Sequence, residues 1–148
     1  MIPPGTEDFF AVMCVACLIA LWKGLAPERL AATGVFLAWV ASAVLHTQDW
    51  VHPQYGMLGV DLILLLILVS LMLLTGRRWL VFASAAHVLG IGAHFAVMLD
   101  LQIRAFAYFT AMAIWGYAVL LAMVIGTLTE GARERRLRQA SGNPASSE

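Results

Sequence analysis

The chain has 148 residues, of which 61% are hydrophobic and only 12% are charged, and its mean hydropathy is +0.84. Soluble domains are about half apolar and about a quarter charged, so a water-soluble fold of this length could not cover so much apolar surface. The formal net charge is zero, and no basic balance indicates a nucleic-acid partner. A single polytopic membrane domain is therefore expected.

Five apolar segments, each bounded by polar or turn residues, follow one another along the chain. They cover residues 9–22, 30–45, 55–74, 79–99 and 106–128. A membrane-spanning helix needs about 20 mostly apolar residues; the last three segments meet this length, the second is slightly short, and the first is the weakest. None shows the strict alternation of membrane β-strands. We predict an all-α integral membrane bundle of five transmembrane helices, with four plus one interfacial N-terminal helix as the alternative.

The cysteines and the two ends of the chain add further expectations. Cys14 and Cys17 lie within the first apolar segment, which excludes a disulfide framework and favours two small buried hydrophobic residues. The N-terminus lacks the positive stretch of a secretory signal peptide. We expect a transmembrane domain over residues 1–129, followed by a charged, largely disordered cytoplasmic tail over residues 130–148 whose first part is a candidate helical extension.

The basic residues predict the orientation of the bundle. Because successive loops alternate between the two sides of the membrane, eight of the nine basic residues fall on one side, with only Arg104 opposite: Lys23, Arg29, Arg77, Arg78, Arg133, Arg135, Arg136 and Arg138. The positive-inside rule places this side in the cytoplasm. The C-terminus is then cytoplasmic and the N-terminus outside; an interfacial first helix would move only the N-terminus inward.

Four polar residues lie within the apolar segments and form a candidate intramembrane site: Asp61, His87, His94 and Tyr117. The rise of a helix places Asp61 and His94 at the same depth below the outer surface. The seven-residue spacing puts His87 and His94 on one face of their helix, which we expect to pack inside the bundle. Tyr117 needs a partner for its hydroxyl, for which the His87 face is one candidate and a satisfied position in the core is the other.

A second candidate site lies at the predicted outer face and comprises His46, Asp49, His52 and Asp100. All four histidines thus fall in the outer half or the middle of the membrane. The cytoplasmic half, in contrast, has no His or carboxylate between its boundary residues. This asymmetry is the most informative feature of the sequence.

Two interpretations of Asp61 and His94 stay open. In the first, the pair is a proton-responsive site, because ionisable residues inside a membrane are functional candidates. In the second, the two side chains bond to each other or to backbone groups and only hold two helices together. Haem b held by His46 and His94 is a further alternative, but no CxxCH, His-x₃-His or HExxH motif is present. We therefore predict no metal and no cofactor.

Three stretches carry a resemblance to known proteins: "GVDLILLLILVSLMLLTGRRW", "AHFAVMLD" and "AFAYFTAMAIWGY". Here the chain resembles a group of small, uncharacterised bacterial polytopic inner-membrane proteins, over roughly residues 59–127. They share a short length, an Asp early in one span and a His before a span-ending Asp. The group has no assigned activity, so the resemblance implies a bacterial inner membrane and no particular chemistry.

The expected function follows from these features. The chain has no Walker motif, nucleophile elbow or paired-carboxylate motif, so we predict that it is not an enzyme. We expect an accessory or assembly subunit of a larger membrane complex, in contact with the lipid bilayer and with a homo- or hetero-oligomeric membrane partner. The alternatives are a small proton, ion or redox protein that uses Asp61 and His94, and a pore-forming oligomer of the holin kind.

Overall fold

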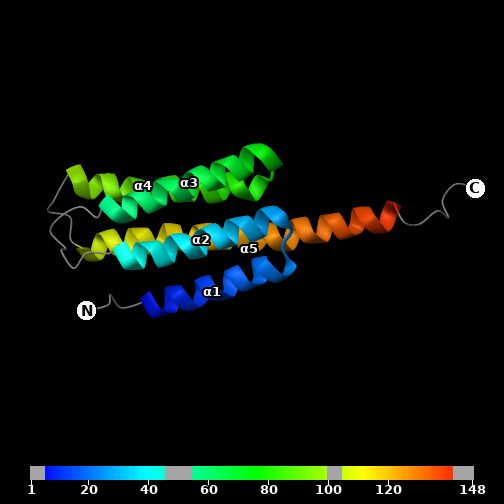
Figure 1. The fold of residues 1–148 in the computed structure, drawn as a ribbon, viewed down its shortest axis with the longest axis horizontal. Coiled ribbons are helices and arrows are strands. Elements are labelled where there is room, and N and C mark those ends of the chain that lie inside the picture. The colour runs from blue at the N-terminus through cyan, green and yellow to red at the C-terminus, as the bar shows by residue number, and fades with distance from the viewer. Residues whose placement is uncertain (1–5, 46–54, 100–104, 142–148) are drawn as a thin grey trace, which may run out of the picture.

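All regular structure in the described part of the chain is helical, as predicted. The computed structural model describes residues 6–45, 55–99 and 105–141. These residues form five helices: α1 (Thr6–Lys23), α2 (Ala26–Leu45), α3 (Tyr55–Thr75), α4 (Arg78–Leu99) and α5 (Ala105–Ser141). Each helix corresponds to one predicted apolar segment, and the helix axes run roughly side by side (Figure 1).

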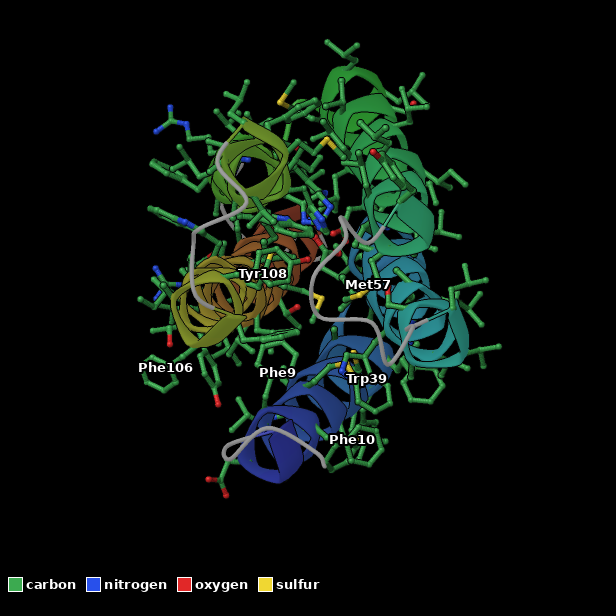
Figure 2. The ribbon with its side chains drawn as sticks, turned by 90° about the vertical axis from the view of Figure 1, so that its left-hand side faces the viewer. Phe9, Phe10, Trp39, Met57, Phe106 and Tyr108 are labelled. Atoms are coloured by element: carbon green, nitrogen blue, oxygen red, sulfur yellow. The ribbon has the colours of Figure 1, made fainter. Side chains whose placement is uncertain are left out.

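The five helices form a closed ring. Each helix packs against the next one in the chain, and α5 returns to pack against α1. Figure 2 looks along the bundle and shows the helices surrounding a common interior, into which side chains project. Four side chains from four different helices are almost completely shielded there and form the centre of the core: Met13, Leu68, Leu80 and Met123.

Four of the five helices are long and apolar enough to cross a membrane, namely α2, α3, α4 and the part of α5 from Phe106 to Arg133. The prediction that the first helix also spans is not supported. The helix α1 has only 18 residues, and these include Glu7, Asp8 and Lys23. Charged residues near both of its ends leave too short an apolar stretch between them. The fold is therefore a helical bundle consistent with a multi-pass membrane protein.

Large apolar side chains face outward on every helix of the bundle. Leu18, Ile63, Phe82 and Leu121 are each exposed over more than half of their surface. In water, an apolar surface of this extent would drive association, whereas hydrocarbon is the natural environment for it. Threonine hydroxyls on the helices bond to the carbonyl four residues earlier, as Thr110 does to Phe106 at 2.7 Å, which satisfies them without water.

One end of the bundle, where α1 and α3 end and α2 and α4 begin, carries the basic residues. We call it the basic end; its described basic side chains are Lys23, Arg29, Arg77, Arg78, Arg133 and Arg136. Tight connections join the helices there. Gly76 adopts a left-handed φ of 62°, and its N–H donates to the Met72 carbonyl at 2.9 Å, which is the usual way for glycine to end a helix.

The last helix continues well beyond this end. The predicted fifth segment ends at residue 128, and the expected domain boundary lies at 129, but α5 runs without a break to Ser141. Its 37 residues correspond to about 55 Å at the helical rise of about 1.5 Å per residue, more than the thickness of a bilayer core. The first part of the predicted tail is therefore helical and projects past the other helices (Figure 1), while residues 142–148 lie outside the described residues.

Candidate functional site

Asp61, His94 and Tyr108 come from three different helices and form one hydrogen-bonded chain far from the basic end. His94 Nε2 lies 2.9 Å from Asp61 Oδ2 on α3, and His94 Nδ1 lies 3.0 Å from the Tyr108 hydroxyl on α5. His94 is 3% exposed and Tyr108 is 8% exposed. Figure 2 shows Tyr108 pointing into the ring of helices. The equal depth inferred for Asp61 and His94 is thus confirmed by their contact.

The partners assign the hydrogens of this chain. A neutral imidazole has one N–H donor and one acceptor nitrogen. The carboxylate of Asp61 accepts from His94 Nε2–H, and His94 Nδ1 then accepts from the hydroxyl of Tyr108. Both ring nitrogens of His94 thus have a partner within the bundle.

His87 reaches the same turn of α3 through a backbone atom. Its Nε2 lies 2.9 Å from the carbonyl oxygen of Asp61, and because a carbonyl only accepts, Nε2 is the nitrogen that carries the hydrogen. The other carboxylate oxygen, Asp61 Oδ1, is 3.9 Å from the same nitrogen. The two histidines of α4 thus hold one residue of α3 from the same helix face. On this face Ala83 and Gly90 are buried, which confirms the prediction that it packs inside the bundle.

A second polar cluster, which the sequence interpretation missed, lies at the basic end around Glu28. This carboxylate is completely buried. Its Oε1 accepts from Arg77 at 2.8 Å and from the Trp79 indole N–H at 3.1 Å, and its Oε2 accepts from the backbone N–H of Leu25 at 3.0 Å. The cluster joins the start of α2 to the connection between α3 and α4, and Glu130 on α5 lies 3.8 Å from Arg77.

The sequence interpretation missed Glu28 because of a helix boundary. The apolar segment was predicted to begin at residue 30, which left Glu28 in a loop, but α2 begins at Ala26. Glu28 is therefore the third residue of the helix, where a Glu side chain can reach back to the first free N–H group. The signal available in the sequence was an acidic residue, Glu28, at the start of one segment and an Arg-x-Trp sequence, beginning at Arg77, at the connection between two later segments.

An apolar layer separates the two polar clusters. The centre of the core lies between them, with Met13, Leu68, Leu80 and Met123 each less than 2% exposed. The hydroxyl of Ser84 is the one buried side-chain oxygen or nitrogen without a hydrogen-bond partner in the described part of the chain. Among the residues that the structure describes, no hydrogen bond or ion pair connects the Asp61 cluster to the Glu28 cluster.

The other predicted site residues do not join these clusters. Tyr117 is 38% exposed, and its ring lies edge-on to that of Phe9, with 5.0 Å between centroids. It therefore packs against α1 and not against His87. Tyr108 takes the place expected for Tyr117, because it lies nine residues, or two and a half helical turns, closer to the start of α5 and so at the depth of His94. The candidate outer-face residues, His46, Asp49, His52 and Asp100, lie outside the described residues, and their site stays a prediction.

Comparisons with known proteins leave the function to be argued from geometry. No protein-family model, no curated protein and no solved structure matches this chain. The resemblance to small bacterial inner-membrane proteins therefore stays a prediction. Among the residues described by the structure, no three His, Cys, Asp or Glu side chains lie together in a way that could hold a metal ion.

Proposed function

We propose that this chain is a non-enzymatic, multi-pass protein of a bacterial inner membrane and serves as an accessory or assembly subunit of a larger membrane complex. The observation that supports this most is the way in which the polar groups of His94 are used. Both ring nitrogens bond to groups of this same chain, Asp61 and Tyr108. These bonds connect α3, α4 and α5, which is how buried polar side chains hold membrane helices together.

The apolar layer beneath the Asp61 cluster supports the same proposal. A transported proton needs a series of groups that exchange hydrogen bonds from one side of the membrane to the other. Below His87, the described interior contains Leu68, Leu80 and Met123 and one isolated polar group, the Ser84 hydroxyl, which has no hydrogen-bond partner and so forms no series of this kind. We therefore favour a structural role for the cluster in this bundle.

A proton-responsive site is the second candidate, and one observation favours it. The Asp61 side chain is 13% exposed, and its Oδ1 has only the distant Nε2 of His87 near it, at 3.9 Å. This oxygen is the group of the cluster that is most available to take up a proton. The haem alternative is disfavoured, because an axial bond from His94 to iron would require the loss of one of its two hydrogen bonds.

We also propose that the basic end faces the cytoplasm, with the C-terminus inside. The described basic residues gather at this end, as the positive-inside rule requires. If α1 crosses the membrane as a fifth span, the N-terminus lies outside; if α1 lies in the interface, the N-terminus lies inside.

The substitution Asp61→Asn separates the two candidate functions. The amide keeps the shape of the side chain and one acceptor for His94 but cannot change its charge. For an accessory subunit, we expect native gel electrophoresis of mild-detergent extracts to show the same large complex with wild type and variant. We also expect liposomes that contain wild-type protein and a trapped pH dye to acidify no faster than empty liposomes.

The control and the contradicting outcome are equally direct. Ser70→Ala changes an exposed residue on the same helix and should leave both measurements unchanged. Fast acidification with wild type that is lost with Asp61→Asn would replace the accessory role by proton transport. Migration of the wild-type chain as a monomer in native membranes would also contradict the proposal.

A further inference from the structure

A groove of about 350 Å³ lies beside α5 at the basic end. Lys23, the last residue of α1, forms one wall, and α5 forms the other through Thr127, Leu128, Gly131 and Ala132. The hydroxyl of Thr127 is occupied, because it donates to the Met123 carbonyl at 2.8 Å. The groove therefore has an apolar α5 wall and, among the side chains that the structure describes there, one charged residue, Lys23.

Lys23 has no carboxylate partner among the described residues. The two carboxylates described at this end, Glu28 and Glu130, lie 2.8 and 3.8 Å from Arg77 and are thus engaged elsewhere. The Lys23 ammonium has only the ring of Trp22 near it, 5.9 Å from the centroid. The exposed ammonium group of Lys23 beside the apolar wall of α5 is therefore complementary to a ligand that carries both an anionic group and a hydrocarbon chain.

The groove lies at the depth of lipid headgroups. The part of α5 between Phe106 and Thr127 rises about 32 Å, which equals the hydrocarbon thickness of a bilayer of about 30 Å. The groove residues follow directly after this stretch. Trp22 is 82% exposed beside it, as expected for an aromatic residue in the interfacial belt.

An apolar stripe leads from the groove toward the middle of the membrane. Leu121, Ile125, Leu128 and Ala132 repeat every three or four residues on α5, which places them on one helix face. Leu121 is 61% exposed, and Ile125 and Leu128 are each 50% exposed. This stripe offers an acyl chain a continuous apolar track that ends at Lys23.

We propose that the groove is a binding site for one anionic phospholipid, with the headgroup phosphate at Lys23 and one acyl chain along the Leu121–Ile125–Leu128 stripe. The excess of basic residues at this end raises the local concentration of anionic lipid. Lys23 then converts this general attraction into retention at one place. The site is independent of the Asp61 cluster and of the accessory role.

The test is native mass spectrometry of the full chain released from nanodiscs that contain equal amounts of phosphatidylglycerol and phosphatidylcholine. We expect one retained phosphatidylglycerol per wild-type chain. Lys23→Gln should reduce this retention about fivefold, since one basic residue near the surface contributes about 1 kcal/mol to anionic-lipid attraction. Ala132→Trp should reduce it as well, because an indole from this exposed position fills the groove.

Matched variants keep the proposal falsifiable. Arg78→Gln removes the same charge from an exposed position at the same end but away from the groove, and Ala107→Trp adds the same indole at the other end of α5; both should retain lipid like wild type. Equal losses in Lys23→Gln and Arg78→Gln would overturn the site in favour of diffuse attraction. Equal retention of the two lipids, or displacement of phosphatidylglycerol by inorganic phosphate alone, would overturn it as well.

Discussion

At the scale of single residues, the energetics of Glu28 differ from those of Asp61. Glu28 is fully buried, and each of its carboxylate oxygens has at least one donor within 3.1 Å. Taking a carboxylate out of water is costly unless such donors replace the water. Asp61 is less enclosed, and only one of its oxygens has a close side-chain donor. The stability of the fold should therefore depend more on Glu28 than on Asp61.

We expect Glu28→Ala to lower the free energy of unfolding by about 3 kcal/mol, because it leaves the partly buried Arg77 guanidinium without its closest partner and the Trp79 indole N–H without its acceptor. Glu28→Gln should cost less, since the amide oxygen still accepts from Trp79. Reversible unfolding in mixed detergent micelles measures both values. Glu130→Gln is the control: its carboxylate is 3.8 Å from Arg77 and partly exposed, and it should cost no more than about 1 kcal/mol. Equal stability of Glu28→Ala and wild type would show that the cluster contributes nothing.

Asp61 and Glu28 also show how much of the candidate site could be predicted from the sequence. Asp61 and His94 could be paired because both lie inside long apolar runs, where helical rise alone fixes their depth. Glu28 could not be placed, because it lies at a helix end, where a shift of a few residues moves a side chain from loop to core. Tyr117 was selected because it lies well inside the predicted segment 106–128, whereas Tyr108 lies near its start.

At the scale of helices, the contact between α4 and α5 depends on one close approach. Trp79, at the start of α4, is 6% exposed, and its indole lies flat against Gly126, where an added Cβ would overlap the ring. The absence of a side chain at position 126 therefore lets the indole reach Glu28. Small residues at helix contacts in membranes allow this kind of packing.

Gly126→Ala should consequently separate α4 from α5 at the basic end and destabilise the fold by about 1–3 kcal/mol, as overpacked positions do. The indole would also move, so the intrinsic fluorescence of the protein should change. Gly92→Ala is the matched control, because no atom lies within 4 Å of the added Cβ there. If both alanine variants unfold at the same denaturant concentration as wild type, the close approach is not required.

The helices themselves could be predicted well from the sequence, and their ends less well. The end of α3 and the start of α4 agree with the predicted segments within one residue, since Gly76 and the arginines after it interrupt the apolar pattern abruptly. The end of α5 could not be predicted from hydropathy, because the helical backbone continues unchanged from the apolar part of the segment into the charged part. Hydropathy records where the bilayer ends and not where the helix ends.

At the scale of the whole molecule, the ring closes through α1, the helix with the weakest membrane signal. It packs against both α2 and α5, and Phe9 covers Gly116 so closely that an added Cβ would lie 2.8 Å from the Phe9 ring. Its shielded side, with Met13 at its centre, belongs to the bundle core. The position of α1 relative to the bilayer therefore follows from that of its two neighbours.

Reporter fusions test whether α1 crosses the membrane or lies in the interface, since it packs along α2 and α5 but has a short apolar stretch. A reporter fused after Glu148 should be accessible only from the cytoplasm, and access to a reporter before Met1 from outside the cell would show that α1 crosses. Labelling of spheroplasts with a membrane-impermeant thiol reagent provides an independent measurement. The labelled residue is a single cysteine added at one end of a chain in which Cys14 and Cys17 are replaced by alanine. Both reporters on the cytoplasmic side would assign α1 to the interface.

The length of α5 has a mechanical consequence. One uninterrupted helix carries Tyr108 near its start and extends about 50 Å further to Ser141. A continuous helix resists bending and twisting, because each turn is cross-linked to the next by backbone bonds. If a docked protein rotated the protruding part of α5, the helix would transmit this rotation to Tyr108 at the opposite end of the bundle. The hydrogen bond between the Tyr108 hydroxyl and the His94 imidazole would then change.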